Sequence, residues 1–267
     1  MKRTTEKKIL VCMLWLCAIA CFSGFPWIFL NWETITSFFK SYGKASDMTV
    51  VLFREQCLFF GFFCIYFLYL KNLGRYKTII KLGSSLIAFM GIFMYVLKNQ
   101  TGFSNISSNY EPFIWFAVGG FMFYLNSNTE NMIPEKEKLP VLTILFRIIS
   151  GMLLLNVTSL ILPETTWNIM FKTSYEAIST YDKYTFGLVS GFMAFSSVII
   201  YYMSSRIKSF YGLSKSIIIF LTLYFVGLLI WGNPFDLYEF PFWLYTITMD
   251  ALSCITIIYI IGNKKCS

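Results

Sequence analysis

The sequence predicts an all-α polytopic membrane protein with about eight transmembrane helices. Of its 267 residues, 57% are hydrophobic and only 13% are charged, and the mean hydropathy is +0.62. A soluble domain of this size would carry about 25% charged residues. Apolar stretches long enough to cross a hydrocarbon core of roughly 30 Å recur along the whole chain. We therefore expect residues 1–267 to form a single transmembrane domain, with two four-helix halves, 1–138 and 139–267, as an alternative division.

Short polar loops separate the expected spans. The spans are the segments 9–30, 49–70, 79–97, 112–126, 141–162, 185–205, 215–232 and 241–261. The first apolar run follows basic residues, as in a signal peptide, but it is too long for the core of one and has no clean cleavage site. We expect it to be retained as a span. The fourth span is the weakest, because it is short and contains Gly119 and Gly120.

Lysine and arginine are unevenly distributed over the loops. With the N-terminus in the cytoplasm, fifteen fall in inner segments, including Lys81 and Lys215 at the inner ends of their spans, and five fall in outer segments. Arg54 and Arg147 lie deeper within spans. Cytoplasmic loops of membrane proteins carry such an excess of basic residues. Both termini are therefore predicted to be cytoplasmic. Removing the fourth span would spoil this bias, which favours keeping it as a crossing.

The cellular membrane is less clearly marked. Lys264 and Lys265 near the C-terminus have the form of a dilysine retrieval signal, and Asn99 and Asn105 begin glycosylation sequons. Both features would suit the endoplasmic reticulum. However, terminal lysines are expected after any span that ends in the cytoplasm, and sequons are frequent by chance. We expect the cytoplasmic membrane of a bacterium, with the endoplasmic reticulum membrane as the alternative.

Two outer loops show helical periodicity. In residues 31–43, apolar and aromatic residues share one face, Asn31 can cap the start and Gly43 can end the helix. In residues 164–181 the shared face consists of Trp167, Phe171, Tyr175, Ile178 and Tyr181. Both segments are predicted to be amphipathic helices at the outer interface. Either could also bind a membrane-protein partner.

Composition excludes several kinds of site. The chain has no histidine, which removes His-ligated zinc, Ser-His-Asp triads and haem ligation by histidine. Six of the seven cysteines lie in expected spans and none lies in an outer loop, so we expect neither a disulfide framework nor a metal site. The net charge of +8 falls in short loops and not in a nucleic-acid-binding patch. No cofactor is expected.

Small residues mark two positions where helices are expected to pack closely. The third span carries Ser84 and Ala88, and the sixth carries Gly187 and Gly191 at the spacing that allows close approach of helix backbones.

Charged residues inside the expected spans are the strongest functional signal. They are Arg54, Glu55, Arg147 and Asp250. A charge held in hydrocarbon costs several kcal/mol unless it has a partner or water, so it marks a candidate functional site. Asp250 is expected near the membrane middle and is the first candidate. Asn156, in the outer half of the fifth span, adds an amide. The charges could form a neutral cluster, with Asp250 paired to Arg54 or Arg147, that ties helices together.

The most favoured function is a transporter or permease-like protein that binds a small polar or ionic ligand at these five residues. One alternative is a non-catalytic module for membrane assembly, immunity or reception. A second is a lipid-modifying enzyme with Glu55 or Asp250 as general base. An enzyme is less favoured, because few polar residues accompany the charges, and no catalytic residue is assigned.

Overall fold

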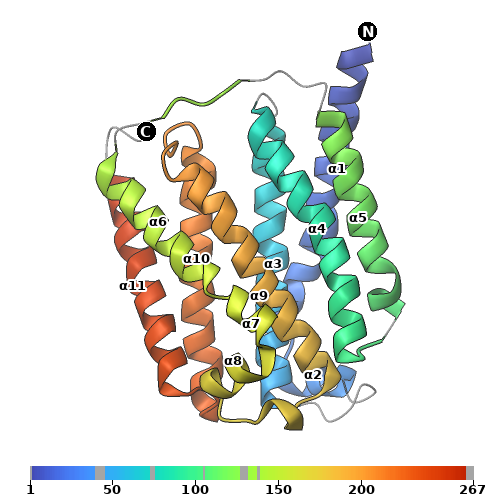
Figure 1. Cartoon of the computed structure of the whole chain (residues 1–267), viewed down its shortest axis with the longest axis vertical. Helices are drawn as coiled ribbons and strands as arrows, with labels where there is room; N and C mark the ends of the chain where they lie inside the picture. The colour runs from blue at the N-terminus through green and yellow to red at the C-terminus, as the bar shows by residue number, and fades with distance from the viewer. Residues whose placement is uncertain are drawn as a thin grey trace. The chain divides into compact units, whose positions relative to one another are not determined.

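The computed structural model describes residues 2–39, 46–72, 76–104, 106–126, 132–136 and 139–262. These residues form helices and connecting turns, without a β-sheet (Figure 1). Among the described residues, seven helical stretches are long and apolar enough to cross a membrane: Thr5–Phe29, Asp47–Lys71, Lys77–Thr101, Pro140–Ile161, Thr180–Met203, Tyr211–Phe235 and Phe240–Gly262. Helices suit lipid because they satisfy their own backbone hydrogen bonds. The chain is therefore a multi-pass membrane protein.

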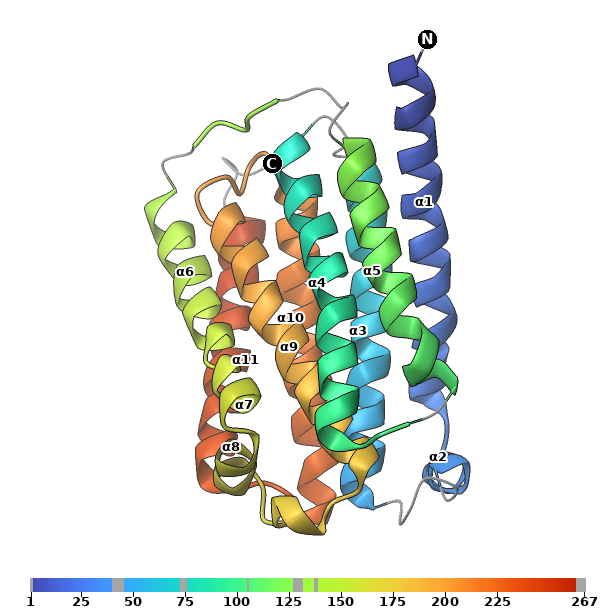
Figure 2. The same cartoon turned by 45° about the vertical axis from the view of Figure 1, so that its right-hand side comes forward.

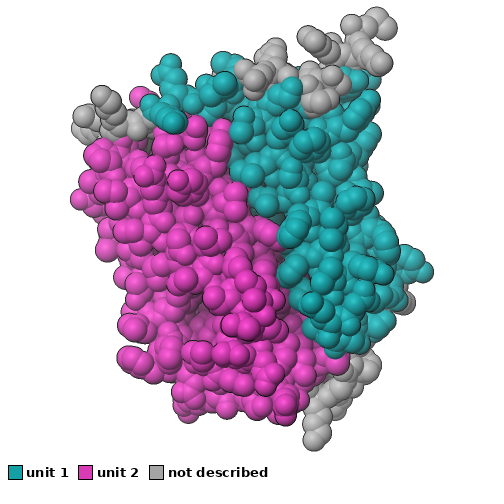
Figure 3. Space-filling view, viewed as in Figure 1, with its two compact units in different colours: residues 1–25, 60–136 teal, residues 26–59, 137–267 magenta. Residues whose placement is uncertain are grey.

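Two compact units divide the chain (Figure 3). Unit 1 contains residues 1–25 and 60–136, and unit 2 contains residues 26–59 and 137–267. Helix α3 (Asp47–Asn72) contributes its first half to unit 2 and its second half to unit 1. A single domain over the whole chain stays a prediction. So do the roles of Gly43, Asn105, Lys264 and Lys265, which lie outside the described residues.

Unit 1 is built on closely packed helices. Its helices are α1 (Lys2–Gly24), α4 (Lys77–Thr101) and α5 (Ile106–Asn126). The last two run side by side in both views (Figures 1 and 2). A side chain at Gly119 of α5 would collide with the backbone of Ser84 and Ala88 on α4, and one at Gly91 of α4 would collide with the backbone of α5. The predicted close packing at Ser84 and Ala88 is therefore confirmed.

Helix α5 covers the expected fourth span, 112–126, but it is not among the seven long apolar stretches. Its first turns are polar and include Asn109 and Glu111. The apolar part is thus too short to meet the same length and hydropathy as the other spans.

Unit 2 contains the remaining helices. They are α2 (Trp32–Phe39), α6 (Pro140–Leu154), α7 (Val157–Ile161), α8 (Pro163–Met170), α9 (Thr180–Met203), α10 (Tyr211–Gly232) and α11 (Phe240–Gly262), with short 3-10 turns between some of them. Helix α6 packs on α9 and α11, and α10 packs on α11. Helix α9 begins at Thr180 rather than at 185, because Ser179 and Asp182 form a capping box: the Asp182 N–H donates to Ser179 Oγ (3.1 Å), and the Ser179 N–H donates to Asp182 Oδ2 (3.3 Å).

The first of the two predicted amphipathic helices, 31–43, is described as α2 over Trp32–Phe39, and residues 40–43 of its range lie outside the described residues. The Thr34 N–H donates to Asn31 Oδ1 at 2.8 Å, so the predicted cap is confirmed.

The prediction of one helix over 164–181 is wrong. Helix α8 ends at Met170, and Phe171 has an extended backbone that forms an isolated antiparallel bridge with Tyr238. The Lys172 N–H donates to Leu237 O (3.0 Å). The backbone thus finds its hydrogen-bond partners across the unit instead of along a helix.

The aromatic residues of this segment pack inward. Trp167 is fully buried, and its Nε1–H donates to Thr173 O at 2.6 Å. Its ring lies 4.3 Å from the Phe171 ring and 4.9 Å from the Phe186 ring, between centroids. Tertiary packing of these rings replaces the interfacial face that the sequence pattern predicts.

Candidate functional site

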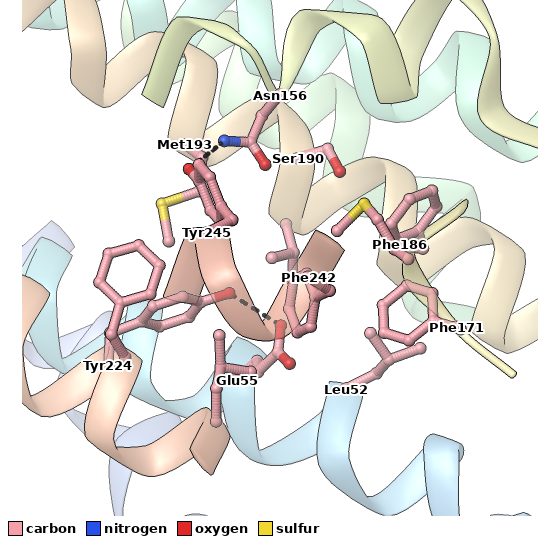
Figure 4. Close-up of a pocket in the computed structure, with 14 residues that line it drawn as sticks. Leu52, Glu55, Asn156, Phe171, Phe186, Ser190, Met193, Tyr224, Phe242 and Tyr245 are labelled. Carbon is pink, nitrogen blue, oxygen red and sulfur yellow. Dashed lines mark hydrogen bonds between the residues drawn. The ribbon is translucent and has the colours of Figure 1, made fainter. Parts of the chain in front are cut away.

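A buried carboxyl lies at the centre of the candidate site. Glu55, on α3, is only 6% exposed, and its neighbours Val51 and Phe59 one turn away on the same helix are buried as well. Tyr224 of α10 donates its hydroxyl to Glu55 Oε2 at 2.9 Å (Figure 4). Within the described part of the chain, Glu55 forms no ion pair. A polar group of this kind is costly to bury without full compensation.

A break in a helix borders the same region. Helix α6 ends at Leu154 and α7 begins at Val157, where the sequence predicts one continuous fifth span. Figure 1 shows the short α7 continuing from α6. At the break, the Asn156 N–H donates to Leu153 O at 3.1 Å. This bond links residues three apart, as in a 3-10 turn, instead of four apart as in an α-helix. The side-chain amide of Asn156 also donates to Leu153 O (3.0 Å), and such competition with the backbone disturbs helices.

Tyr245 of α11 forms hydrogen bonds with residues at the break. Its hydroxyl accepts a hydrogen bond from Asn156 Nδ2 (3.0 Å) and donates to Met152 O (3.3 Å). The second bond gives Met152 O, which lies at the break, a side-chain donor in addition to the Leu155 N–H. Nδ2 is fully used, whereas Asn156 Oδ1 has no hydrogen-bond partner among the described residues.

Glu55 and Asn156 line the same small cavity, with a volume of about 30 Å³ (Figure 4). Its polar lining consists of Glu55, Asn156, Ser190, Tyr224 and Tyr245, and most of the rest is apolar. Ser190 is 3% exposed, and its hydroxyl has no hydrogen-bond partner in the described part of the chain. A cavity of this volume holds roughly two water molecules. We call it the inner cavity.

Arg54 lies outside the lining of the inner cavity. Its Nη2 donates to Leu30 O at 3.3 Å, and its guanidinium lies 5.9 Å from the Trp32 ring and 5.7 Å from the Trp231 ring. Adjacent residues on a helix point about 100° apart, which explains why Arg54 and Glu55 have separate surroundings. Arg54 is thus held by aromatic rings and a carbonyl, which stabilise a cation without a carboxylate.

Arg147 and Asp250 also lie apart from the cavity. Arg147 is exposed on α6, with its guanidinium 5.8 Å from the Tyr201 ring. Asp250 is half-buried on α11, and its Oδ1 is 3.9 Å from the thiol of Cys254 on the same helix. The possible pairing of Asp250 with Arg54 or Arg147 does not occur among the described residues. Among the described residues, the ion pair that does form, between Lys172 and Asp236, lies at the surface.

Sequence reasoning missed three polar residues of the inner cavity: Ser190, Tyr224 and Tyr245. In an apolar span, a tyrosine whose hydroxyl has a partner cannot be told from one that packs like phenylalanine. Ser190 adjoins the small-residue positions of α9 and fits a packing role equally well. The sequence does indicate that a buried Glu55 needs a hydrogen-bond donor from another helix. Tyr224 is one of the residues that could supply it.

Comparison with protein-family models, curated proteins and solved structures finds no match to this chain. The assignment as a multi-pass membrane protein therefore rests on its long apolar helices. Any more specific function has to be argued from the geometry of the site.

Proposed function

We propose that this protein is a membrane carrier that binds a proton or a monovalent cation at Glu55. The observation that carries the proposal is the burial of Glu55 with Tyr224 as donor and with no cationic side chain paired to it among the described residues. An ionised carboxylate in a low-dielectric interior is very costly unless a positive charge accompanies it. That charge is supplied by a proton or by a cation that enters the inner cavity.

The other polar groups of the inner cavity suit a small cation. Asn156 Oδ1 and Ser190 Oγ are oxygens that have no partner among the described residues, and hard cations prefer oxygen ligands. Carriers commonly bind ions where a membrane helix is interrupted. The break at Asn156 fits that arrangement. A volume of about 30 Å³ suits a proton with water, or one alkali cation, and is too small for a larger solute.

For the orientation we propose that both termini are cytoplasmic and that α5 is a further crossing, in the cytoplasmic membrane of a bacterium. The excess of basic residues in alternate loops supports the orientation. The packing of α5 along α4 within unit 1 supports the additional crossing.

Of the five residues predicted to bind ligand, we propose Glu55 and Asn156 as ligand contacts. Arg54, Arg147 and Asp250 stay predictions. Their positions outside the lining of the inner cavity count against direct contact with a ligand bound there.

Two alternative functions have less support. A lipid-modifying enzyme needs room for a headgroup beside its carboxyl, and the inner cavity is about 30 Å³. A module that binds a partner through 164–181 needs its aromatic residues exposed, but Trp167 and Phe171 are buried within unit 2. The segment 31–43 stays a candidate partner surface, because Phe38 is exposed.

The test is cation binding by the full chain in lipid nanodiscs. The melting temperature is measured over a pH series and with lithium, sodium or potassium chloride, using choline chloride to hold ionic strength. A ligand that binds the native state raises the melting temperature. A response to pH alone identifies a proton site, and a response to one alkali cation at fixed pH identifies a cation site.

Glu55→Gln is expected to lose the response and to melt at the same or a higher temperature, because it removes a buried ionisable group. Asp236→Asn, at an exposed position, is the matched control and is expected to keep the response. A response that survives in Glu55→Gln and disappears in Asp250→Asn would move the site to Asp250 and overturn the proposal. Flux of the same ion into proteoliposomes then tests carriage, and specific binding without flux would reject a carrier.

A further inference from the structure

A second cavity of about 150 Å³, which we call the outer cavity, adjoins the inner one in unit 2. Four residues line both cavities: Asn156, Met170, Phe242 and Tyr245. The hydrogen-bonded pair of Asn156 and Tyr245 is therefore part of the wall between them.

The outer cavity has uncharged polar groups in its lining. Ser159 is 2% exposed, and its hydroxyl has no hydrogen-bond partner among the described residues. The Thr166 hydroxyl likewise has none there, whereas the Thr158 hydroxyl donates to Leu155 O at 2.7 Å. A hydroxyl in the wall of a cavity can form a hydrogen bond with a ligand there, which adds to the affinity of that ligand. No charged residue lines this cavity.

The surroundings of the outer cavity are apolar and exposed. Leu155, in its lining, is 59% exposed, and Ile161 and Leu244 on the adjoining helices are 71% and 56% exposed. In a membrane protein such side chains face lipid. A ligand that reaches this cavity through them must be soluble in hydrocarbon.

We propose that the outer cavity binds a small uncharged amphiphile, a molecule with a compact apolar body and a hydroxyl or carbonyl group. This proposal rests on the proposed function in one respect: the amphiphile is the solute whose binding is coupled to the cation at Glu55. The apolar body contacts Met170, Pro241 and Phe242, and the polar group bonds to Ser159 or Thr166. Apolar cavities of about this volume accept benzene, so benzyl alcohol is a suitable probe and toluene its apolar counterpart.

Coupling follows from the shared wall. An amphiphile bonded to Ser159 or Thr166 also packs against Asn156 and Tyr245, which line both cavities, and so shifts the hydrogen bond between them. It thereby changes how Asn156 Oδ1 is held in the inner cavity. Cation affinity and amphiphile affinity must then change by the same factor.

The experiment labels the full chain in nanodiscs with a photoreactive diazirine analogue of benzyl alcohol and maps the labelled peptides. Labelling is expected to concentrate on residues 155–170 and 241–245. Benzyl alcohol should compete about threefold to tenfold better than toluene, because of one additional hydrogen bond. Glycerol, which lacks an apolar body, should not compete. Competition by diacylglycerol alone would identify a lipid-binding site and would contradict the proposal that the ligand is a small solute.

Variants separate the cavity from bulk lipid. Ser159→Ala combined with Thr166→Val should remove the preference for benzyl alcohol over toluene. Thr248→Val on α11 should keep it, because the Thr248 hydroxyl bonds to Leu244 O of its own helix and does not line the cavity. Uniform labelling of all lipid-facing helices, or a preference unchanged in the double variant, would overturn the site.

The coupling is tested apart from the site. Benzyl alcohol should shift the cation affinity of the wild type by about fivefold or more. Specific labelling without this shift would overturn the coupling. Specific labelling of a wild-type protein that shows no cation response would contradict the proposed function while leaving the amphiphile site intact.

Discussion

The contact between helices α4 and α5 in unit 1 differs in kind from the contact in unit 2 between α11 and the end of α6, where the break before α7 begins. The first pair is closed by small residues, so that the backbones of Gly119 and Ala88 come together without side chains between them. The second pair borders cavities and has a hydrogen bond between Asn156 and Tyr245. The difference indicates that unit 1 uses its contact for stability, whereas unit 2 gives up close packing to hold polar groups.

The largest expected effect is in the closed contact. Gly119→Ala puts a methyl group against the backbone of Ser84 and Ala88, and backbone cannot move aside as a flexible side chain can. We expect a loss of about 3 kcal/mol in the free energy of unfolding, the upper end for overpacking. The measurement is reversible unfolding in mixed micelles.

Gly120→Ala is the matched control, because a methyl group there meets nothing within 4 Å. It should leave stability unchanged or raise it by about 0.5–1 kcal/mol, since alanine favours a helix over glycine. Equal effects at the two glycines would show that the contact is not closed by small residues.

A smaller effect is expected in the open contact. Asn156→Ala removes the side-chain bonds to Leu153 O and to the Tyr245 hydroxyl, while Leu153 O keeps the backbone N–H of residue 156, and we expect a loss of about 1–2 kcal/mol. Tyr245→Phe should cost about 1 kcal/mol. In the double variant the losses should fall short of their sum by about 0.6 kcal/mol, the usual coupling of a hydrogen bond in a membrane. Strict additivity would mean that the two side chains do not interact.

The smallest effect concerns a charge pair at the surface. Lys172 Nζ lies 2.6 Å from Asp236 Oδ2, but both side chains are largely exposed. Asp236 has a φ of 50°, a conformation that asparagine also tolerates. Asp236→Asn should therefore change stability by less than about 0.5 kcal/mol. A loss of stability above about 1 kcal/mol that disappears at high salt would contradict this expectation. It would mean that the ion pair stabilises the protein as much as the buried polar contacts do.

The helical membrane fold could be predicted because a run of apolar residues must be helical in lipid. The capped start of α2 could be predicted from Asn31, since capping is a local property. The end of α8 could not, because the bridge between Phe171 and Tyr238 joins residues far apart in the sequence. The burial of Trp167 escaped prediction for the same reason, as its periodicity equally suits an interfacial helix.

The candidate site was predictable in kind and only partly in its residues. Glu55 and Asn156 stood out as polar residues in apolar runs. Asp250 and Arg147 stood out equally, and nothing in the sequence told which side of its helix faces the unit. A span that is apolar on every side has no polar face to show which residues point into the protein. The depth of a residue in the membrane can therefore be deduced from the sequence, but the direction of its side chain cannot. The contribution of Tyr224 depends on a contact between α3 and α10 that only the fold reveals.

Infrared difference spectroscopy of the carboxyl groups shows whether Glu55 is protonated. Wild type and Glu55→Gln are compared in nanodiscs at neutral pH, first without alkali cations and then with them. We expect a carboxylic-acid carbonyl band in the wild type that is missing from Glu55→Gln. An alkali cation should remove this band if it replaces the proton. An ionised Glu55 in the absence of any alkali cation would contradict the claim that a proton or a bound cation must accompany this carboxyl.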